Sequence, residues 1–243
     1  MILRDITLPT PQENILYDEA LLYLAENNQS GEVLRFWESA RLFIVLGRIS
    51  NAREDIHAEA VLRDNIPVGR RASGGGTVLQ GKGCLNYSLV LSKEAHPSIS
   101  DLKGSYQFIL SKIILALGHL GVKAVFHPPS DLALAGNNKK VSGNAQKRAR
   151  RFILHHGTLL YDFDIAQMET YLAVPQDTPA YRQNRSHRNF VANIPVPVES
   201  IKGEIKKAFG AAREENTLSA QESRCLSGFL NSRPLTMVPF QNS

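Results

Sequence analysis

The β-rich runs of this chain come in neighbouring groups and do not alternate strictly with helical runs. Four of them follow one another over residues 122–126, 131–135, 140–146 and 152–160. A doubly wound parallel sheet needs a crossover helix after nearly every strand, whereas hairpin-like neighbours need only short turns. The order of the runs therefore predicts a mixed α+β fold and disfavours a doubly wound sheet.

Further β-rich runs cover residues 33–38, 42–46 and 86–91. Thr10 and Pro11 are a typical N-cap and first-turn pair, and apolar residues follow them at helical spacing up to Leu24. Other helices are predicted near residues 55–63, 100–120, 165–172, 199–209 and 218–230. Residues 175–190 are polar and predict a long loop. No convincing boundary divides the chain, so we expect residues 1–243 to form one domain.

Composition narrows the class of protein. The chain has 243 residues, a formal net charge of +5 and a pI near 9.2. This mild basic balance permits an anionic ligand or an acidic partner but indicates no nucleic-acid binding. No apolar run is long enough to span a membrane, and no secretory signal opens the chain. We therefore expect a cytoplasmic protein that does not bind membranes.

The segment Arg70-Arg71-Ala72-Ser73-Gly74-Gly75-Gly76-Thr77-Val78 places three consecutive glycines between β-like runs. Glycines let backbone N–H groups approach an anion closely, and the two arginines would supply compensating charge. A tight strand entry beside surface arginines explains the same pattern. The local sequence does not decide between these interpretations.

A second segment is basic and contains Lys140 at the start of a strand-like run that soon meets Ser142 and Gly143. A lysine there can serve as a point charge for a phosphate or a carboxylate. Taken alone, however, the many neighbouring lysines and arginines favour a solvated basic hairpin.

His155 and His156 lie inside an apolar strand-like run, where adjacent side chains point to opposite faces. They cannot both line one site, so a metal pair is not expected, and one of them is a candidate for a buried, hydrogen-bonded histidine. Ser130 and Asp131 precede another apolar run and would place one carboxylate at a strand start. Such a carboxylate can hold Mg²⁺ or a ribose, or begin a turn.

Taken together and in order, these segments resemble the lipoate–protein ligase A family, whose catalytic domain is shared with biotin protein ligases and lipoyl or octanoyl transferases. The resemblance rests on Arg-Arg-x-Ser-Gly-Gly-Gly at 70–76, Ser-Asp at 130–131, Lys-Val-Ser-Gly-x-Ala at 140–145 and His-Gly-Thr-Leu-Leu at 156–160. It implies a mixed, largely antiparallel β-sheet flanked by helices. It also implies that residues 1–243 form one catalytic domain without a C-terminal accessory domain.

In this family, lipoate or octanoate reacts with ATP to give an acyl-adenylate, and a lysine of a lipoyl domain or of the glycine-cleavage H protein then takes the acyl group. The resemblance makes Lys140 the catalytic residue and Asp131 a candidate Mg²⁺ ligand. An apolar pocket for the acyl chain is expected near Val45, Val78 and Leu89. The residues expected to bind substrate or ATP are Arg70, Arg71, Ser73, Gly74, Gly75, Gly76, Thr77, Val78, Asn86, Asp131, Ser142, Gly143, Ala145, His156, Gly157 and Thr158.

The chain also departs from the family. Gln80 and Gly81 replace the usual His-Asp after the glycine segment, and Cys84 replaces an Asn whose role Asn86 can partly take. Transferase relatives use a cysteine nucleophile at either of two positions, and neither position holds a cysteine here. A transferase that uses Cys84 and a non-catalytic acyl-adenylate-binding module stay open as alternatives, although a small buried packing residue is the favoured interpretation of Cys84. A biotin ligase is disfavoured because the GRGRRG pattern is absent.

Partners follow from the same resemblance. Short family members work with a separate accessory protein, so one is a candidate partner here. The basic residues Arg182, Arg185, His187 and Arg188 fall in the predicted loop. They would face an acidic acceptor domain or the nucleotide, or they are only solvated.

Overall fold

The computed structural model describes residues 1–175 and 178–233. Its strands are β1 (Ile2–Asp5), β2 (Val33–Trp37), β3 (Phe43–Leu46), β4 (Val68–Arg70), β5 (Val78–Gln80), β6 (Cys84–Ser92), β7 (Ala124–His127), β8 (Asp131–Leu134), β9 (Lys140–Arg148), β10 (Phe152–Leu160) and β11 (Arg213–Glu214). Its α-helices are α1 (Pro11–Glu26), α2 (Ala52–Asp55), α3 (Ala58–Arg63), α4 (Leu102–His119), α5 (Ala166–Tyr171), α6 (His187–Phe190), α7 (Val198–Phe209) and α8 (Ala220–Ser232). Two 3₁₀ turns are η1 (Pro97–Ile99) and η2 (Ala180–Arg182).

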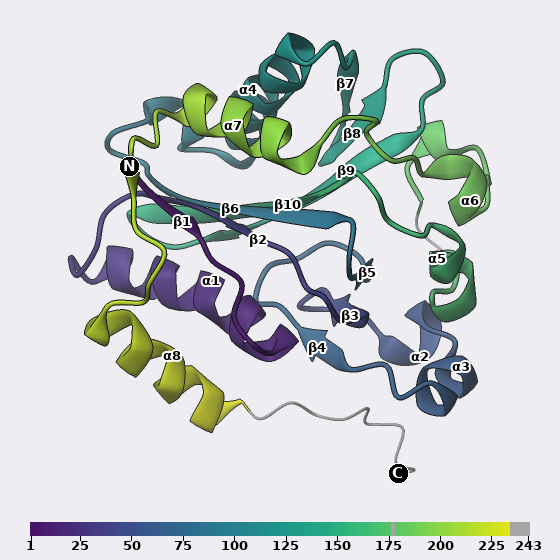
Figure 1. Ribbon diagram of the computed structural model, residues 1–243, viewed down its shortest axis with the longest axis horizontal. Coiled ribbons are helices and arrows are strands. Elements are labelled where there is room, and N and C mark those ends of the chain that lie inside the picture. Colours follow the sequence, from purple (N-terminus) through teal and green to yellow (C-terminus); the bar gives the residue numbers. More distant parts are fainter. Residues whose placement is uncertain (176–177, 234–243) are drawn as a thin grey trace.

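Within the described residues the strands form two sheets (Figure 1). The larger sheet has the strand order β11-β1-β2-β6-β10-β9-β8-β7, and the smaller one has the order β4-β3-β5. In the larger sheet β1 runs parallel to β2 and to β11, and all its other neighbouring pairs are antiparallel. The predicted mixed, largely antiparallel α+β fold is therefore confirmed.

Strand β6 shows how the sequence pattern divides the molecule into layers. Leu85, Tyr87, Leu89 and Leu91 alternate toward the core beneath α4 and α7. The residues between them face the other side, where Val90 packs under α1 and α8, while Asn86 and Ser88 line a pocket. The period-two pattern thus buries one face completely and leaves a polar strip on the other.

The predicted start of the first helix is confirmed. The Thr10 side chain accepts the N–H of Glu13, the Glu13 side chain accepts the N–H of Thr10, and Pro11 occupies the first turn. This reciprocal arrangement satisfies helix-end donors that would otherwise lack partners. No helix within the described residues is long and apolar enough to cross a membrane.

Two predicted elements differ from the structure. The expected helix at 55–63 is broken at Ile56, which forms a bridge to Leu172, while the N–H of His57 donates to the Tyr171 carbonyl. Pairing with a distant segment therefore outcompetes local helical hydrogen bonds. The expected loop at 175–190 contains η2 and α6 within its described part. The short strands β1 and β11 were not predicted, whereas β4 and β5 correspond to the β-like runs on either side of the glycine segment.

Candidate active site

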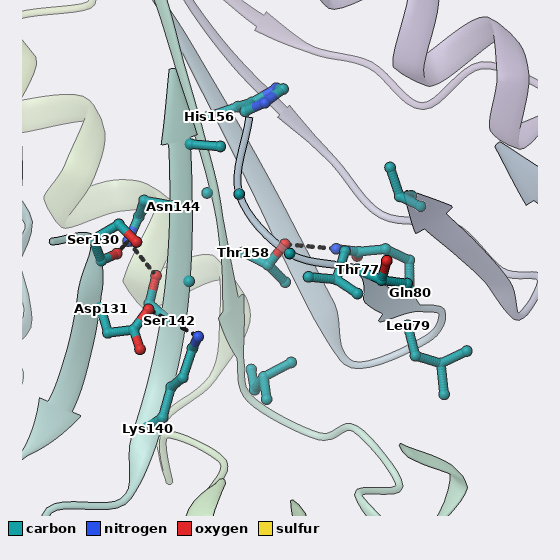
Figure 2. A pocket seen from close by; sticks show the side chains of 18 of the residues that line it. Thr77, Leu79, Gln80, Ser130, Asp131, Lys140, Ser142, Asn144, His156 and Thr158 are labelled. Carbon is teal, nitrogen blue, oxygen red and sulfur yellow. Dashed lines mark hydrogen bonds and ion pairs between the residues drawn. The ribbon is translucent and has the colours of Figure 1, made fainter. Parts of the chain in front are cut away.

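A pocket of about 460 Å³ opens between the polar strip of the larger sheet and the smaller sheet. Most of the residues singled out in the sequence line it: Arg71, Gly75, Gly76, Thr77, Val78, Asn86, Asp131, Lys140, Ser142, Gly143, Ala145, His156, Gly157 and Thr158. Arg70, Ser73, Gly74 and Cys84 do not line it. Segments that are far apart in the sequence therefore meet at one cavity (Figure 2).

Strand register explains how these residues come together. Two rows of paired residues cross the sheet below the pocket: Gly143, Thr158, Asn86 and Trp37 in one, and Ala145, His156, Ser88 and Arg35 in the next. Because β9 contributes a glycine and an alanine to these rows, side chains from neighbouring segments can occupy the space above it. The apolar walls include Ile15, Trp37, Val45 and Val78.

Val45 and Val78 lie in this wall, as expected for an apolar pocket, but the expectation that the pocket lies near Leu89 was wrong. Leu89 is fully buried in the core on the opposite face of β6. Its position one residue from Ser88 puts it on the other side of the pleat.

Lys140 and Asp131 form an ion pair at one side of the pocket. The Lys140 Nζ lies 2.8 Å from Asp131 Oδ1, and the hydroxyl of Tyr181 donates to Asp131 Oδ2 at 2.8 Å. A Cβ at residue 143 would lie 3.1 Å from the Lys140 Nζ, so Gly143 leaves the room that the ammonium occupies. The amine is therefore held in the pocket by its neighbours and is not part of a solvated hairpin.

The glycine loop is held from inside by Arg71. Its guanidinium donates to the carbonyls of Gly74 and Gly76 at 2.6 and 2.8 Å and to Ser73 Oγ at 3.0 Å. The N–H groups of Gly74, Gly75 and Gly76 have no acceptor within the part of the chain that the structure describes. The loop carbonyls thus turn toward Arg71, and its N–H groups remain available as donors.

Of the two arginines that the sequence suggested as compensating charges, only Arg71 lines the pocket. Arg70 donates to the carbonyls of Gly47 and Ser50 at 2.6 and 2.9 Å and does not line the pocket. Burial lowers the pKa of Arg71 to about 10, and its donors are spent largely on loop carbonyls. Their main structural role is to fix two loops.

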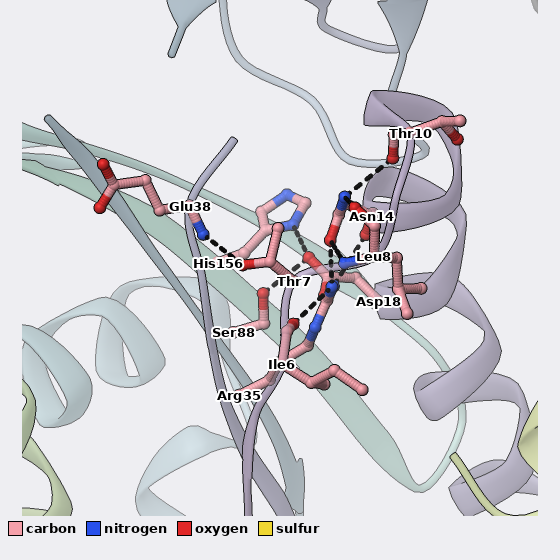
Figure 3. Close-up of polar contacts among 10 residues, drawn as sticks. All are labelled: Ile6, Thr7, Leu8, Thr10, Asn14, Asp18, Arg35, Glu38, Ser88 and His156. Carbon is pink, nitrogen blue, oxygen red and sulfur yellow. Dashed lines mark hydrogen bonds and ion pairs between the residues drawn. The ribbon is translucent and has the colours of Figure 1, made fainter. Parts of the chain in front are cut away.

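A buried polar network lies behind the glycine loop (Figure 3). Arg35 donates to Asp18 Oδ1 at 2.6 Å, and Asp18 Oδ2 accepts from Ser88 Oγ at 2.6 Å and from His156 Nδ1 at 3.5 Å. Burial alone would raise the pKa of Asp18, but the charge of Arg35 and these hydrogen bonds lower it. Asp18 is therefore a carboxylate.

This carboxylate sets the tautomer of His156. With Nδ1 protonated toward Asp18, Nε2 accepts the hydroxyl of Ser73 at 2.6 Å. Ser73 Oγ in turn accepts the Nε–H of Arg71. The predicted site residues Ser73 and His156 are thus linked through hydrogen bonds to the glycine loop. His155 points to the other face, where it is fully buried, as the strand pattern predicted for one of the pair.

Gln80, Asn86 and Thr158 close a ring of hydrogen bonds at the pocket floor. Gln80 Nε2 donates to Thr158 Oγ1 at 2.7 Å, Thr158 Oγ1 donates to Asn86 Oδ1 at 2.8 Å, and Asn86 Nδ2 donates to Gln80 Oε1 at 3.0 Å. The departure at Gln80 is therefore compatible with an ordered site, because the glutamine finds partners on two neighbouring strands.

Cys84 lies outside the pocket. Its side chain is fully buried in a cluster that includes Leu160 and Phe163, and burial raises the pKa of its thiol. This arrangement agrees with a packing residue.

The basic segment near α6 is divided between the pocket and the surface. Arg182 and His187 are buried and line the cavity, Arg185 donates to the carbonyls of Tyr181 and Asn138, and Arg188 is exposed beside Glu169. Only Arg188 thus fits the solvated interpretation.

Sequence reasoning missed Asp18, Arg35 and Tyr181. Asp18 follows Ile15 at a spacing of three and so lies on the apolar face of its helix, and Arg35 interrupts an otherwise apolar strand. A charged residue at a core position is a signal for a buried pair. No local signal marks Tyr181, which is brought to Asp131 by the fold.

Solved structures share this fold. The chain superposes with a TM-score of 0.81 and 22% identity on a bi-partite lipoate protein ligase of Thermoplasma acidophilum that was studied with its E2 lipoyl domain, covering 100% of this chain and 99% of that one. A lipoate-protein ligase A bound with ATP gives a TM-score of 0.78 and 21% identity, covering 96% and 94%. These likenesses define the class of fold.

The sequence comparisons identify the family. The model for the lipoyl protein ligase A/B catalytic domain matches residues 10–210. A probable lipoate-protein ligase A of Mycoplasma genitalium is 32% identical over 78% of this chain and 55% of its own length. Octanoyltransferase LipM of Bacillus subtilis is 30% identical over 82% of this chain and 80% of its own. The chain belongs to the lipoyl protein ligase A/B catalytic-domain family of enzymes, and it spans about half the length of its mycoplasma relatives.

Proposed function

We propose that this chain is an ATP-dependent acyl–protein ligase that activates lipoate or octanoate as an acyl-adenylate and passes the acyl group to a lysine of an acceptor protein. The observation that carries the proposal is a pocket with a held lysine and open backbone donors but no thiol among the described residues that line it. The chain has two cysteines, Cys84 and Cys225, and neither lies in this lining.

The absence of a lining thiol argues for activation by a nucleotide. A carboxylate does not acylate an amine until it carries a leaving group, and a transferase meets this need with a cysteine thioester. Cys84 would have to leave a fully buried position and ionise against a raised pKa. A transferase remains the second candidate because octanoyltransferase LipM is among the similar proteins.

The proposed first step is displacement at the α-phosphorus of ATP. A carboxylate oxygen bonds to phosphorus while the bond to the bridging oxygen breaks, and pyrophosphate leaves with that electron pair. Lys140 and the glycine-loop N–H groups stabilise the negative charge on the carboxyl and phosphoryl oxygens. The apolar wall of Ile15, Trp37 and Val45 takes the aliphatic chain.

The second step is aminolysis. The neutral amine of an acceptor lysine attacks the acyl carbon, the bond to the adenylate oxygen breaks, and AMP leaves with that electron pair while the proton of the amine passes to water. The charge that develops on the acyl oxygen is stabilised by Lys140 and the same N–H donors. No covalent enzyme intermediate is needed.

Asp131 is the residue that would contact Mg²⁺. The other lining carboxylate, Asp18, is engaged by Arg35, and the described residues contain no cluster of three or more metal-ligating side chains. One carboxylate fits an ion that arrives mostly coordinated by nucleotide phosphates and water. When bound, such an ion would neutralise phosphate charge.

For acceptors we propose a lipoyl domain or a glycine-cleavage H protein, with the reaction in the cytoplasm. The lipoyl domain is supported by the Thermoplasma ligase, which was studied with an E2 lipoyl domain. That protein is bi-partite, which supports a separate accessory chain here as well. We also propose that residues 1–243 act as one catalytic domain.

The double substitution Cys84→Ser and Cys225→Ser tests the proposal against the transferase. We expect the double variant to keep ATP-dependent acylation of a lipoyl domain within about threefold of the unchanged protein. Mass spectrometry of the acceptor gives the rate with octanoate plus ATP and, separately, with an octanoyl thioester of a carrier protein. Loss of thioester-driven transfer in the double variant, together with no ATP-driven product from the unchanged protein, would establish the transferase instead.

A further inference from the structure

Arg182 is a buried cation that forms no salt bridge with a carboxylate within the described residues. It is 4% exposed and lines the pocket. Its Nε donates to the Arg185 carbonyl at 3.0 Å, but its Nη2 is buried and has no hydrogen-bond partner among residues 1–175 and 178–233. A buried charged donor without a partner raises the free energy of the folded protein. A ligand that accepts a hydrogen bond from Arg182 would remove this cost.

The segment around Arg182 holds the guanidinium in place before any ligand arrives. The guanidinium lies 4.8 Å from the ring centroid of Phe190. Arg185 Nε donates back to the Arg182 carbonyl at 3.0 Å, and Arg185 Nη2 donates to the Tyr181 carbonyl at 2.7 Å. Arg182 is thus preorganised, and a ligand would not have to order it.

Tyr181 fixes this segment to the catalytic side of the pocket. Its ring stacks on His127 with a centroid distance of 4.0 Å and an interplanar angle of 10°. Its hydroxyl donates to Asp131, the partner of Lys140. The residue directly before Arg182 is therefore bonded to the carboxylate that holds the catalytic amine.

Positive charge accumulates around this position. Burial, and after it the charges of Arg182 and Lys140, lower the pKa of His187, which also lines the pocket. Lys140 is partly balanced by Asp131, whereas Arg182 forms no ion pair in the described part of the chain. The local excess of positive charge fits a multiply charged anion, and a planar fork of donors matches phosphate oxygens.

We propose that Arg182 binds the β- and γ-phosphates of the nucleotide, the group that leaves as pyrophosphate. This inference rests on the proposed function and adds a residue for its leaving group. Lys140 then acts at the α-phosphate and the carboxyl, while Arg182 stabilises the charge that the broken phosphoanhydride bond delivers to pyrophosphate. Transfer from a finished acyl-adenylate involves no pyrophosphate and does not need Arg182.

Because the proposed roles of Lys140 and Arg182 differ, variants of Arg182 should affect only the step that involves pyrophosphate. Arg182→Gln removes the charge, Arg182→Lys keeps charge without the fork, and Arg188→Gln is the matched control at an exposed arginine. Each full-length variant is assayed for inorganic pyrophosphate binding by calorimetry, for ATP–pyrophosphate exchange, and for transfer from synthetic lipoyl-adenylate to a lipoyl domain. We expect Arg182→Gln to raise the pyrophosphate Kd and the KM for ATP at least tenfold, with transfer from lipoyl-adenylate within twofold of the unchanged protein. Arg182→Lys should give intermediate values, and Arg188→Gln should behave like the unchanged protein.

Two results would overturn the inference. One is unchanged pyrophosphate binding in Arg182→Gln. The other is an equal loss of exchange and of transfer from lipoyl-adenylate in both Arg182 variants, which would make the residue a structural support. If the proposed function is wrong, ATP–pyrophosphate exchange will be absent in the unchanged protein. The calorimetric comparison then still decides whether Arg182 binds pyrophosphate.

Discussion

At the scale of single residues, Lys140 depends on two neighbours for its position. Asp131 attracts its ammonium at 2.8 Å, and the missing side chain at Gly143 leaves space beside it. Tyr181 donates to the other oxygen of Asp131, which limits how the carboxylate can turn. For the proposed mechanism this means that the amine is oriented before the reaction, at little further cost in conformational entropy.

Lys140→Ala should lower acyl-adenylate formation at least a hundredfold, because the charge that stabilises the phosphoryl transition state is lost. Its effect on the free energy of unfolding should stay near 1 kcal/mol, since the lysine side chain is 30% exposed and partly exposed pairs contribute little. Adenylate formation and thermal unfolding are measured in parallel. Lys139→Ala is the control, because Lys139 does not line the pocket. Full activity in Lys140→Ala would remove this lysine from the mechanism.

Individual residues also show where prediction from sequence ends. The glycine segment, Lys140 and Asp131 could be assigned to one site only through the family resemblance of the combined segments, because each local pattern alone left an alternative open. The roles of Arg70 and Arg71 could not be predicted, since their partners are carbonyls that only the folded loops bring near. The same holds for Gln80, whose partner Thr158 lies on β10.

At the scale of elements, β9 and β10 supply the pocket floor. Gly143 pairs with Thr158 across this hairpin, and Ala145 pairs with His156. The small residues on β9 leave depth in the pocket, and the polar residues on β10 form hydrogen bonds. The hairpin therefore determines both the space and the polarity of the site.

Gly143→Ala should reduce adenylate formation about tenfold or more with little change in stability. Its Cβ would lie 3.1 Å from the Lys140 Cε and Nζ, and a flexible lysine can move away without disturbing the fold. Gly136→Ala is the matched control, since a Cβ there meets nothing within 4 Å. The comparison uses kcat and the midpoint of thermal unfolding of both variants. Unchanged kcat in Gly143→Ala would show that the position of the ammonium is not critical.

Long, strongly patterned elements and the apolar four-residue strands β3, β7 and β8 were predictable, whereas other short elements were not. The apolar run at 152–160 coincides with β10, and the cap at Thr10 marks the start of α1. Strands β1 and β11, which were not predicted, contain four and two residues, so periodicity has few positions to act on. The break at Ile56 depends on its bridge to Leu172, more than a hundred residues away.

At the scale of the whole molecule, the buried His155 links stability to pH. Burial, with a smaller effect from His156, lowers the pKa of His155 to about 3. Between about pH 6.5 and pH 3 the unfolded chain binds a proton here that the folded chain does not. The free energy of unfolding should therefore fall as pH falls through this window, by at most about 1.4 kcal/mol per pH unit from this residue.

His155→Gln removes the titrating group and should flatten this dependence. Urea unfolding at pH 7, 6 and 5 gives the slope for each protein, and His119→Gln at an exposed position is the control. If His155→Gln and the unchanged protein showed the same slope, the buried neutral His155 would not be the cause of the lower stability in acid.

ATP–pyrophosphate exchange reports whether a carboxylic acid is activated by ATP in this pocket. The purified chain is incubated with ATP, Mg²⁺ and labelled pyrophosphate, with lipoate, octanoate or biotin added separately, and with an octanoyl thioester of a carrier protein in a parallel transfer assay. We predict exchange that depends on lipoate or octanoate, not on biotin, and that persists in the cysteine-free variant. Absence of exchange with every acid, together with acyl transfer from the thioester without ATP, would show that the chain is a transferase and not an ATP-dependent ligase.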